Sequence, residues 1–238
     1  MRILILTTDT THHCFYVKEL VKKYKNIEFF VIVEKTTVKL KKNFLEKLIE
    51  KYEKEKWFKN QNINIDQVIK NYKYKIINNK NIIKKINSIR PKIIISYGIG
   101  KIKKEILKQI NVNIFNLHGG NPEEYRGLDS HLWAIYHNDF NNLKVCMHRL
   151  EDKLDTGKIY KIKKILLYKN LKLYQLRSIT SELCVLLTVN LINNLLKYKK
   201  INLIKQKKIG RYYSKMPNEL KLGVNNKFNK FTSLINND

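Results

Sequence analysis

The most informative stretch of the chain runs from Asn111 to Tyr160 and reads NVNIFNLHGGNPEEYRGLDSHLWAIYHNDFNNLKVCMHRLEDKLDTGKIY. Lys, Asn, Ile and Leu dominate elsewhere, whereas this stretch holds four of the 8 Gly and four of the 6 His residues. Glycine lets the backbone turn tightly or approach a ligand closely, and His is the side chain that titrates near neutral pH. Their concentration predicts that the active region lies here.

Three side chains in this stretch suit acyl transfer to an amine. Val112 to Phe115 is mostly apolar, so Asn116 and His118 should end a strand, where residues two apart point to the same side. Asp155 lies in a turn after another short apolar run, Lys144 to Met147. An amide and a protonated imidazole can stabilise an oxyanion, while a carboxylate favours the imidazolium and accepts a proton.

These residues, with Tyr125-Arg126-Gly127 and Leu154-Asp155-Thr156-Gly157, resemble the motifs of the folate-dependent formyltransferase family. That family includes methionyl-tRNA, glycinamide ribonucleotide and sugar N-formyltransferases. Its pattern is Asn-x-His at a strand end, an Arg-Gly loop and an Asp-x-Gly further along. The match covers about Ile93 to Tyr160. Many members carry a Ser-Leu-Leu-Pro-like run after the His, where this chain has Gly119-Gly120-Asn121-Pro122.

The resemblance implies a Rossmann-like core, with a mostly parallel sheet flanked by helices, and N10-formyltetrahydrofolate as the formyl donor. It assigns catalysis to Asn116, His118 and Asp155. The expected folate contacts are Tyr97, Gly98, Ile99, Gly120, Asn121, Leu150, Asp152 and Leu154, and the expected acceptor contacts are Tyr125, Arg126 and Gly127, with His12 from the first strand-to-helix loop.

Several of these residues have a second interpretation. The pair His12-His13 could contact the phosphate or amine of a substrate, or it could form a solvated helix start. Arg126 could bind a phosphate or sugar, or it could hold its own loop through backbone hydrogen bonds. His131 and His137 are interpreted as structural or exposed residues. His148, at the end of a strand, is a candidate folate contact.

The composition is that of a folded protein with an unusual charge. The 238 residues can bury a sizeable core, and one domain with an appendage is expected. The net charge of +28 raises the question of a nucleic-acid binder. However, arginines are few and lysines are spread along the chain, which indicates a compositional bias. We therefore expect no nucleic-acid partner, although a basic protein attracts negatively charged substrates such as nucleotide sugars.

Other classes of site are not expected. The 3 Cys residues are widely spaced, so neither a zinc site nor a disulfide framework is predicted. The N-terminal apolar run is too short for a signal peptide, and no stretch was expected to reach the length of an apolar membrane span. We expect a cytoplasmic protein without a membrane association. The loop after the first strand lacks Gly-x-Gly-x-x-Gly, which argues against a nicotinamide or flavin dehydrogenase.

Apolar runs alternate with helical patterns, which predicts a parallel α/β sheet. A catalytic domain is expected over residues 1–200 and a strand-rich tail, a hairpin or dimerisation arm, over 201–238. In that tail, Tyr212 and Tyr213 could stack on a base or sugar, or pack in a dimer interface. The expected strands are 2–8, 27–34, 92–97, 112–118, 144–147 and 159–167, and the expected helices are 12–23, 38–62, 81–88, 103–110, 131–137 and 171–199.

The short tail decides between acceptors within the resemblance. Methionyl-tRNA enzymes carry a sizeable C-terminal barrel domain, whereas only residues 200–238 follow the last long helix here. Glycinamide ribonucleotide enzymes are shorter and have a different loop after the His. Small sugar N-formyltransferases have a short strand-rich tail that often supports dimers. We therefore expect a homodimer that formylates a nucleotide-linked 4-amino-4,6-dideoxyhexose, a sugar of the kind used in lipopolysaccharide O-antigens.

Three alternatives stay open at this stage. The acceptor could be another amine, on glycinamide ribonucleotide or methionyl-tRNA. The same three residues could serve a formyltetrahydrofolate hydrolase, which formate release without any amine would identify. A non-catalytic RNA-binding module would instead show salt-dependent RNA binding without turnover.

Overall fold

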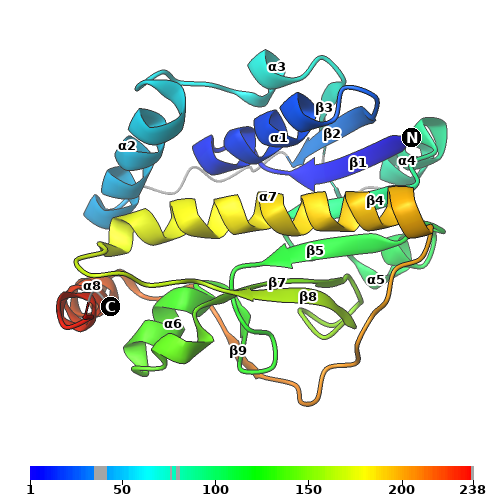
Figure 1. Ribbon diagram of the computed structural model, residues 1–238. Coiled ribbons are helices and arrows are strands. Elements are labelled where there is room, and N and C mark those ends of the chain that lie inside the picture. Colours follow the sequence, from blue (N-terminus) through cyan, green and yellow to red (C-terminus); the bar gives the residue numbers. More distant parts are fainter. Residues whose placement is uncertain (35–41, 76, 79–80, 237–238) are drawn as a thin grey trace.

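A seven-stranded sheet forms the centre of the protein, as the computed structural model in Figure 1 shows. Residues 1–34, 42–75, 77–78 and 81–236 are described. The strands of the sheet are β1 (Arg2–Thr7), β2 (Glu28–Glu34), β3 (Tyr72–Lys75), β4 (Ile93–Tyr97), β5 (Ile114–His118), β7 (Lys144–Arg149) and β8 (Ile159–Lys164). They follow the order β3-β2-β1-β4-β5-β7-β8. The first five strands pair in parallel, and β7 pairs antiparallel with both of its neighbours, β5 and β8. The predicted mostly parallel sheet is therefore confirmed.

Helices cover both faces of this sheet (Figure 1). Those of the described residues are α1 (Thr11–Lys23), α2 (Phe44–Phe58), α3 (Ile65–Val68), α4 (Asn81–Ile89), α5 (Lys104–Leu107), α6 (Ser130–Tyr136), the 3-10 helix η1 (Phe140–Asn142), α7 (Leu173–Tyr198) and α8 (Asn218–Ser233). Buried residues of α1 and α7 pack with Ile3 and Ile5 of β1 on one face. Those of α4 and α5 pack with Leu4 and Leu6 on the other face. β1 is apolar on both sides because both of its faces are covered.

The order of the strands reverses between β1 and β4. From β1 the chain adds β2 and β3 on one side, and it then returns to add β4 and β5 on the other side. In open α/β sheets, ligands bind in the crevice at the carboxyl ends of the strands beside such a reversal. The ends of β1, β4 and β5 are therefore the expected place of a binding site.

The long helix α7 is the central element of one layer. Among the helices of the described residues, α7 alone is long and apolar enough to cross a membrane. The mean hydropathy of its most apolar stretch is 1.5. A helix is predicted here over residues 171–199, whereas no apolar stretch of membrane-spanning length is predicted, because Ser, Thr and Asn residues interrupt the apolar run. In the structure it packs against α1, α2 and β7. Polar contacts also tie it to the core: Thr188 Oγ1 lies 2.8 Å from the hydroxyl of Tyr16, and Ser181 Oγ lies 3.1 Å from that of Tyr97.

The charged helix predicted over residues 38–62 is shorter in the structure. α2 begins after Asn43, whose side chain accepts a hydrogen bond from the backbone N–H of Glu46, while the Glu46 carboxylate accepts one from the backbone of Asn43. This capping box fixes the start of the helix. The helix ends before Lys59, which has a left-handed backbone with φ of 49°. Residues 38–41 of the predicted helix lie outside the described residues.

The tail, residues 201–238, differs from the predicted strand-rich hairpin. It contains one strand of 3 residues, β9 (Arg211–Tyr213), and then the 16-residue helix α8. The helix forms because Leu220, Val224 and Phe228 recur every four residues, which places them on one helical face. This face packs against α6, and Val224 and Phe228 belong to the same core cluster as α7. β9 pairs in parallel with β6 (Tyr125–Gly127) to form a second, two-stranded sheet.

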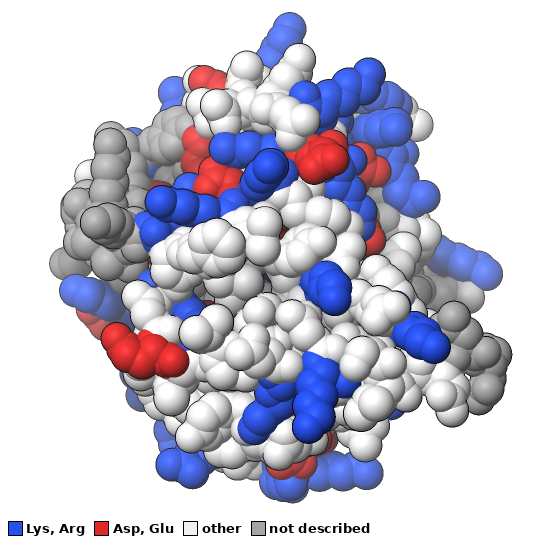
Figure 2. Space-filling view, turned by 90° about the vertical axis from the view of Figure 1, so that its left-hand side faces the viewer, with Lys and Arg blue, Asp and Glu red and all other residues white. Residues whose placement is uncertain are grey.

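The positive charge is distributed among neutral and acidic groups on the face that Figure 2 shows. Lys and Arg side chains are separated there by neutral residues, and Asp and Glu side chains lie among them in its upper part. Some lysines also form ion pairs with acidic residues; Lys56, for example, lies 2.7 Å from Glu182. This arrangement agrees with a compositional origin of the net charge of +28.

Candidate active site

A cavity of about 370 Å³ opens at the carboxyl ends of β4 and β5. It is lined by these strand ends, by the loops that follow β4 and β7, by the end of β6 and by one residue of β9. The lining contains the three predicted catalytic residues, Asn116, His118 and Asp155, and five of the predicted binding residues, Gly98, Ile99, Gly127, Leu150 and Leu154. The two loops that were predicted to bind folate, after β4 and after β7, therefore meet at this cavity.

Asn116 and His118 project from β5 as the alternation of a strand requires. Phe115 and Leu117 of the same strand are buried in the core that holds α7. Asn116 and His118 therefore point to the opposite side of the sheet, toward the cavity. The hydroxyl of Ser96 on β4 donates a hydrogen bond of 3.1 Å to Asn116 Oδ1, which turns the amide nitrogen of Asn116 toward Asp155.

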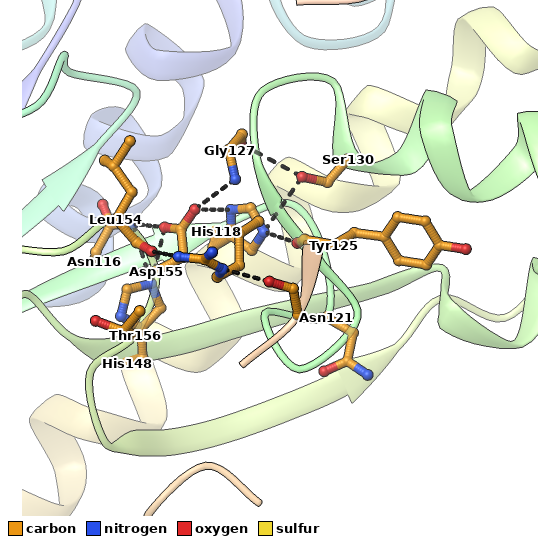
Figure 3. Close-up of polar contacts among 12 residues, drawn as sticks. Asn116, His118, Asn121, Tyr125, Gly127, Ser130, His148, Leu154, Asp155 and Thr156 are labelled. Atoms are coloured by element: carbon orange, nitrogen blue, oxygen red, sulfur yellow. Dashed lines mark hydrogen bonds and ion pairs between the residues drawn. The ribbon is translucent and has the colours of Figure 1, made fainter. Parts of the chain in front are cut away.

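Asp155 is the centre of the polar network in Figure 3. Its Oδ2 accepts a hydrogen bond of 2.8 Å from the backbone N–H of Gly127 and lies 3.6 Å from Nδ1 of His118. Its Oδ1 lies 3.3 Å from Nε2 of His148 and 3.4 Å from Nδ2 of Asn116. The carboxylate thus touches two imidazoles, an amide and a backbone donor.

These partners keep Asp155 ionised although it is only 8% exposed. Burial by itself would raise the pKa of this carboxyl. The charge of His118, the contacts with His148 and the Gly127 N–H outweigh that effect and hold the pKa of Asp155 below its usual range. Asp155 is therefore a carboxylate at neutral pH.

The ring of His118 is held between two acceptors (Figure 3). Its Nε2 lies 2.8 Å from the backbone oxygen of Tyr125, which can only accept, so this nitrogen carries a proton. Its Nδ1 faces the Asp155 carboxylate at 3.6 Å. An acceptor therefore faces each ring nitrogen.

The arrangement suits the stabilisation of a negative charge in the cavity. An imidazole and an amide project from β5, and the ionised Asp155 lies beside both of them. In a partly buried site such charges interact more strongly than in water. The geometry therefore supports a reaction in which an oxyanion develops, such as attack on a carbonyl group. Across the described ranges, no group of three His, Cys, Asp or Glu side chains is placed to hold a metal ion.

Four of the predicted folate residues do not line the cavity: Tyr97, Gly120, Asn121 and Asp152. The hydroxyl of Tyr97 contacts Ser181 in the core, because alternation along β4 turns this side chain toward α7. Asn121 donates to Asn142 at 2.8 Å. Asp152 is half-buried and pairs with Lys104 at 3.2 Å.

Three of the predicted acceptor residues also lie outside the lining. Arg126 donates to the backbone oxygens of Gly210 and Leu154, at 2.6 and 3.0 Å, so it holds the loops together. The hydroxyl of Tyr125 donates to Asp139. His12 lies 3.9 Å from Glu53 on the side of α2, and burial together with the charges of His13 and Arg177 lowers its pKa.

Gly120 supports the cavity from behind. A Cβ atom at this position would lie 2.7 Å from Nε2 of His118 and 2.7 Å from Cβ of Ser130. The absence of a side chain therefore allows the His118 ring to sit against Ser130. The predicted importance of Gly120 has a steric reason here, since the residue packs against the imidazole.

Replacing Gly120 with Ala is expected to lower the turnover number by about tenfold to a hundredfold, because the added methyl group displaces His118. Steady-state kinetics and circular dichroism of the purified variant provide the measurement. Gly223→Ala is the matched control, since nothing lies within 4 Å of a Cβ there. That change in the interior of α8 should stabilise the protein by about 0.5 kcal/mol and leave the turnover unchanged. Normal kinetics in the Gly120 variant would contradict this role.

Ser96 and Leu128 were not predicted as site residues, and His148 and Tyr212 had more than one interpretation. His148 was an open alternative, and the antiparallel register of β5 and β7 places it directly opposite Asn116. Ser96 fixes the Asn116 amide, and its place on β4 beside Asn116 follows from the parallel register. Leu128 and Tyr212 complete the wall of the cavity. No local sequence pattern announces these pairings, because each of them joins segments that lie far apart in the chain.

A second cavity of about 350 Å³ lies beside the turn after β1. Its charged lining is balanced, with the acids Asp9, Glu46 and Glu50 and the bases Lys42, Lys54 and Arg177. None of the predicted site residues belongs to this lining. We therefore assign the candidate active site to the cavity that contains His118.

Comparisons with known proteins agree with this fold. A family model described as formyl transferase matches residues 1–184. Among curated proteins, the bifunctional polymyxin resistance protein ArnA of Wigglesworthia glossinidia brevipalpis is 36% identical over 86 residues, which are 36% of this chain and 13% of that protein. The chain thus matches only a small part of that relative's length.

Three solved structures share the fold at low sequence identity. A sugar N-formyltransferase from a Shewanella species has a TM-score of 0.64 at 14% identity, over 90% of this chain and 76% of that one. The formyltransferase PseJ from Anoxybacillus kamchatkensis, in complex with UDP-4,6-dideoxy-4-formamido-L-AltNAc and tetrahydrofolate, has a TM-score of 0.52 at 19% identity, over 94% and 90%. HypX from Aquifex aeolicus, in complex with tetrahydrofolic acid, has a TM-score of 0.58 at 17% identity, over 93% and 31%.

Proposed function

The chain belongs to the formyl transferase family, and on this basis we propose that it transfers the formyl group of N10-formyltetrahydrofolate to the amine of a nucleotide-linked amino sugar. The observation that carries the proposal is the convergence of Asn116, His118 and Asp155 at one cavity of about 370 Å³. An amide donor, an imidazolium and a buried carboxylate together provide what acyl transfer to an amine requires.

The cavity fits the flat ring system of a reduced pterin. Ile99, Ile102, Leu150 and Leu154 supply apolar surface on its walls. The backbone at Gly98, where φ is +77°, turns beside these side chains and offers hydrogen-bonding groups to a planar ligand. Ligand sites commonly combine apolar walls with a few polar groups in this way. We therefore assign the formyl donor, which supplies an activated carbonyl carbon, to this part of the cavity.

Asn116 and His118 would hold the charge that develops on the formyl oxygen during attack by the amine. The Nε2–H of His118 is directed at the Tyr125 oxygen, so the ring acts through its positive charge. The amide of Asn116 contacts His148 and Asp155 only at 3.3 and 3.4 Å. Contacts of this length are weak, and a charged oxygen in the cavity can replace them.

Asp155 has two roles in this proposal. It balances the imidazolium of His118, and it accepts the proton that the nitrogen of the acceptor loses. A carboxylate of lowered pKa is a weak base toward a free amine. It can still accept the proton once the nitrogen is bonded to the tetrahedral carbon, because that nitrogen is far more acidic. The bond from this carbon to N10 of the donor then breaks, and N10 takes up a proton as tetrahydrofolate leaves.

The acceptor is assigned to the wall formed by Gly127, Leu128 and Tyr212. Tyr212 is 50% exposed, and an aromatic side chain at this position could stack on the apolar side of a sugar ring. Two structural neighbours support an amino-sugar acceptor: one is a sugar N-formyltransferase, and the other, PseJ, was solved with a UDP-linked sugar. The net charge of +28 favours the approach of a nucleoside diphosphate.

The test is formyl transfer from N10-formyltetrahydrofolate across a panel of nucleotide-linked amino sugars, with mass detection of the formamide. We expect turnover on one sugar, and loss of this turnover in His118→Asn. Formate release without any amine would instead identify a hydrolase. Formylation of glycinamide ribonucleotide or methionyl-tRNA, with every sugar inactive, would overturn the assigned acceptor and leave the reaction class in place.

Three further properties stay predictions. A homodimer is expected, and sedimentation of the purified protein measures it. A cytoplasmic location is expected, and cell fractionation measures that. A role in lipopolysaccharide O-antigen synthesis follows only if the acceptor is a sugar of that class.

A further inference from the structure

The segment from Ile204 to Tyr213 follows the edge of the active site, although the family model matches only residues 1–184. Ile204 exchanges two backbone hydrogen bonds of 2.8 Å with Ile159. Further along, the backbone N–H of Gly210 donates to Pro122 at 3.1 Å. At the end of the segment, Tyr213 accepts a hydrogen bond of 3.0 Å from the N–H of Leu128. The segment is thus attached on both sides of the loops that carry Asp155 and Gly127.

Gln206 is the residue of this segment that reaches Asp155. Its side-chain Nε2 donates to the backbone oxygen of Asp155 at 2.8 Å and to that of Gly157 at 2.9 Å. Gln206 is only 9% exposed. Because both partners can only accept, the two distances also fix which end of the amide faces the turn. Oε1 has no partner among the described residues, so the two donated bonds are the contacts that the amide makes there.

The backbone of Asp155 needs such support. Its φ is 55°, in the left-handed region that residues with a Cβ atom rarely adopt. Such a conformation persists only where the surrounding structure over-determines it. Two residues later the chain passes so close to Arg149 that a Cβ atom at Gly157 would lie 1.8 Å from its backbone oxygen. Gln206 bridges the two carbonyl groups of this tight turn.

The same turn sets the direction of the Asp155 carboxylate. The carboxylate reaches Gly127 N at 2.8 Å and His118 Nδ1 at 3.6 Å. A rotation of the peptide at Asp155 would move both oxygens away from these partners. Small displacements of a reacting group cost large factors in rate, because the productive geometry is narrow. The backbone bridge therefore bears on catalysis as well as on folding.

We propose that Gln206 is a positioning residue for Asp155, and that the segment Ile204–Tyr213 is for this reason part of the active site. The proposal rests on the proposed formyl transfer for its kinetic readout only. Gln206 touches no reacting atom, and it acts by holding the turn through its two donated hydrogen bonds.

The first variant is Gln206→Leu, which keeps the size of the side chain and removes both donors. We expect the turnover number to fall by about tenfold to a hundredfold, with the KM of the donor changed by less than about threefold. Thr232→Val is the matched control. The hydroxyl of Thr232 is buried and donates to the backbone oxygen of Leu171 at 2.8 Å, at a distance from the cavity lining. Its loss should lower the stability and leave the turnover number unchanged.

The second variant, Gln206→Glu, remains informative if the first does not fold. As a carboxylate, Glu at this position repels both carbonyl oxygens, whereas the protonated acid can donate one hydrogen bond. Its turnover relative to that of the unchanged protein should therefore rise as the pH is lowered from about 8 to about 5.5. A purely structural role, measured at a temperature where both proteins are folded, gives a constant ratio.

A spectroscopic readout separates this proposal from the proposed function. The ring nitrogens of His118 are observed by NMR at a fixed pH in labelled protein, without any substrate. We expect their chemical shifts to change in Gln206→Leu and to stay in place in Thr232→Val, because only the former moves Asp155.

If the unchanged protein formylates no amine, the proposed function fails and these shifts alone decide on Gln206. Unmoved His118 shifts in a folded Gln206→Leu variant overturn the positioning role. So does a turnover number within about twofold of that of the unchanged protein.

Discussion

Replacing Asp155 with Asn is expected to lower the turnover number for formyl transfer by about a thousandfold. The amide cannot balance the imidazolium of His118, which Asp155 faces at 3.6 Å. It also cannot accept the proton of the attacking amine. The variant keeps the shape of the side chain, so the loss measures charge and proton transfer. Single-turnover kinetics with the donor in excess provide the measurement.

The same substitution has a distinct effect on acid stability. Burial alone would raise the pKa of Asp155, but the charge of His118, the contacts with His148 and the Gly127 N–H lower it in the folded state. Asp155 therefore stabilises the fold above the ordinary carboxyl pKa of about 4, and this contribution is lost as the pH falls further. Urea unfolding should show that the unchanged protein loses more stability than Asp155→Asn below about pH 4.

A turnover number of Asp155→Asn within tenfold of that of the unchanged protein at neutral pH would contradict the catalytic role of Asp155.

Replacing Arg177 with Met is expected to destabilise the protein by about 3 kcal/mol. Glu53 on α2 is fully buried, and both of its oxygens accept hydrogen bonds of 2.7 Å from the Arg177 guanidinium on α7. Without Arg177 a buried carboxylate remains without its charged partner, which costs more than the pair contributes. Chemical unfolding of the single variant, followed by circular dichroism, measures the loss.

The double variant Glu53→Gln with Arg177→Met is the control for this explanation. It removes the buried charge together with its partner, so it should recover part of the lost stability. The turnover number should change little in both, because neither side chain lines the cavity that contains His118. A loss of less than about 1 kcal/mol in the single variant would show that Glu53 finds another partner or water.

The fold could be predicted largely from local patterns. Continuous apolar runs predict strands that are covered on both faces. Ile93–Tyr97 is such a run, and the structure buries it at every position. The alternation along β5 placed Asn116 and His118 on the same side without any knowledge of the tertiary structure. The prediction of a strand-rich tail was wrong. The aromatic pair Tyr212-Tyr213 favours a strand, but the four-residue spacing of Leu220, Val224 and Phe228 favours the helix that follows it.

The central strands and the polar residues that end them could be predicted from the sequence, since both depend on spacing within a few residues. What surrounds those residues depends on contacts between distant segments. The antiparallel register of β5 and β7 places His148 opposite Asn116, and the return of the tail brings Gln206 to Asp155 and Tyr212 to the cavity. Such contacts depend on packing between segments far apart in the chain, which leaves no periodic signal in either segment.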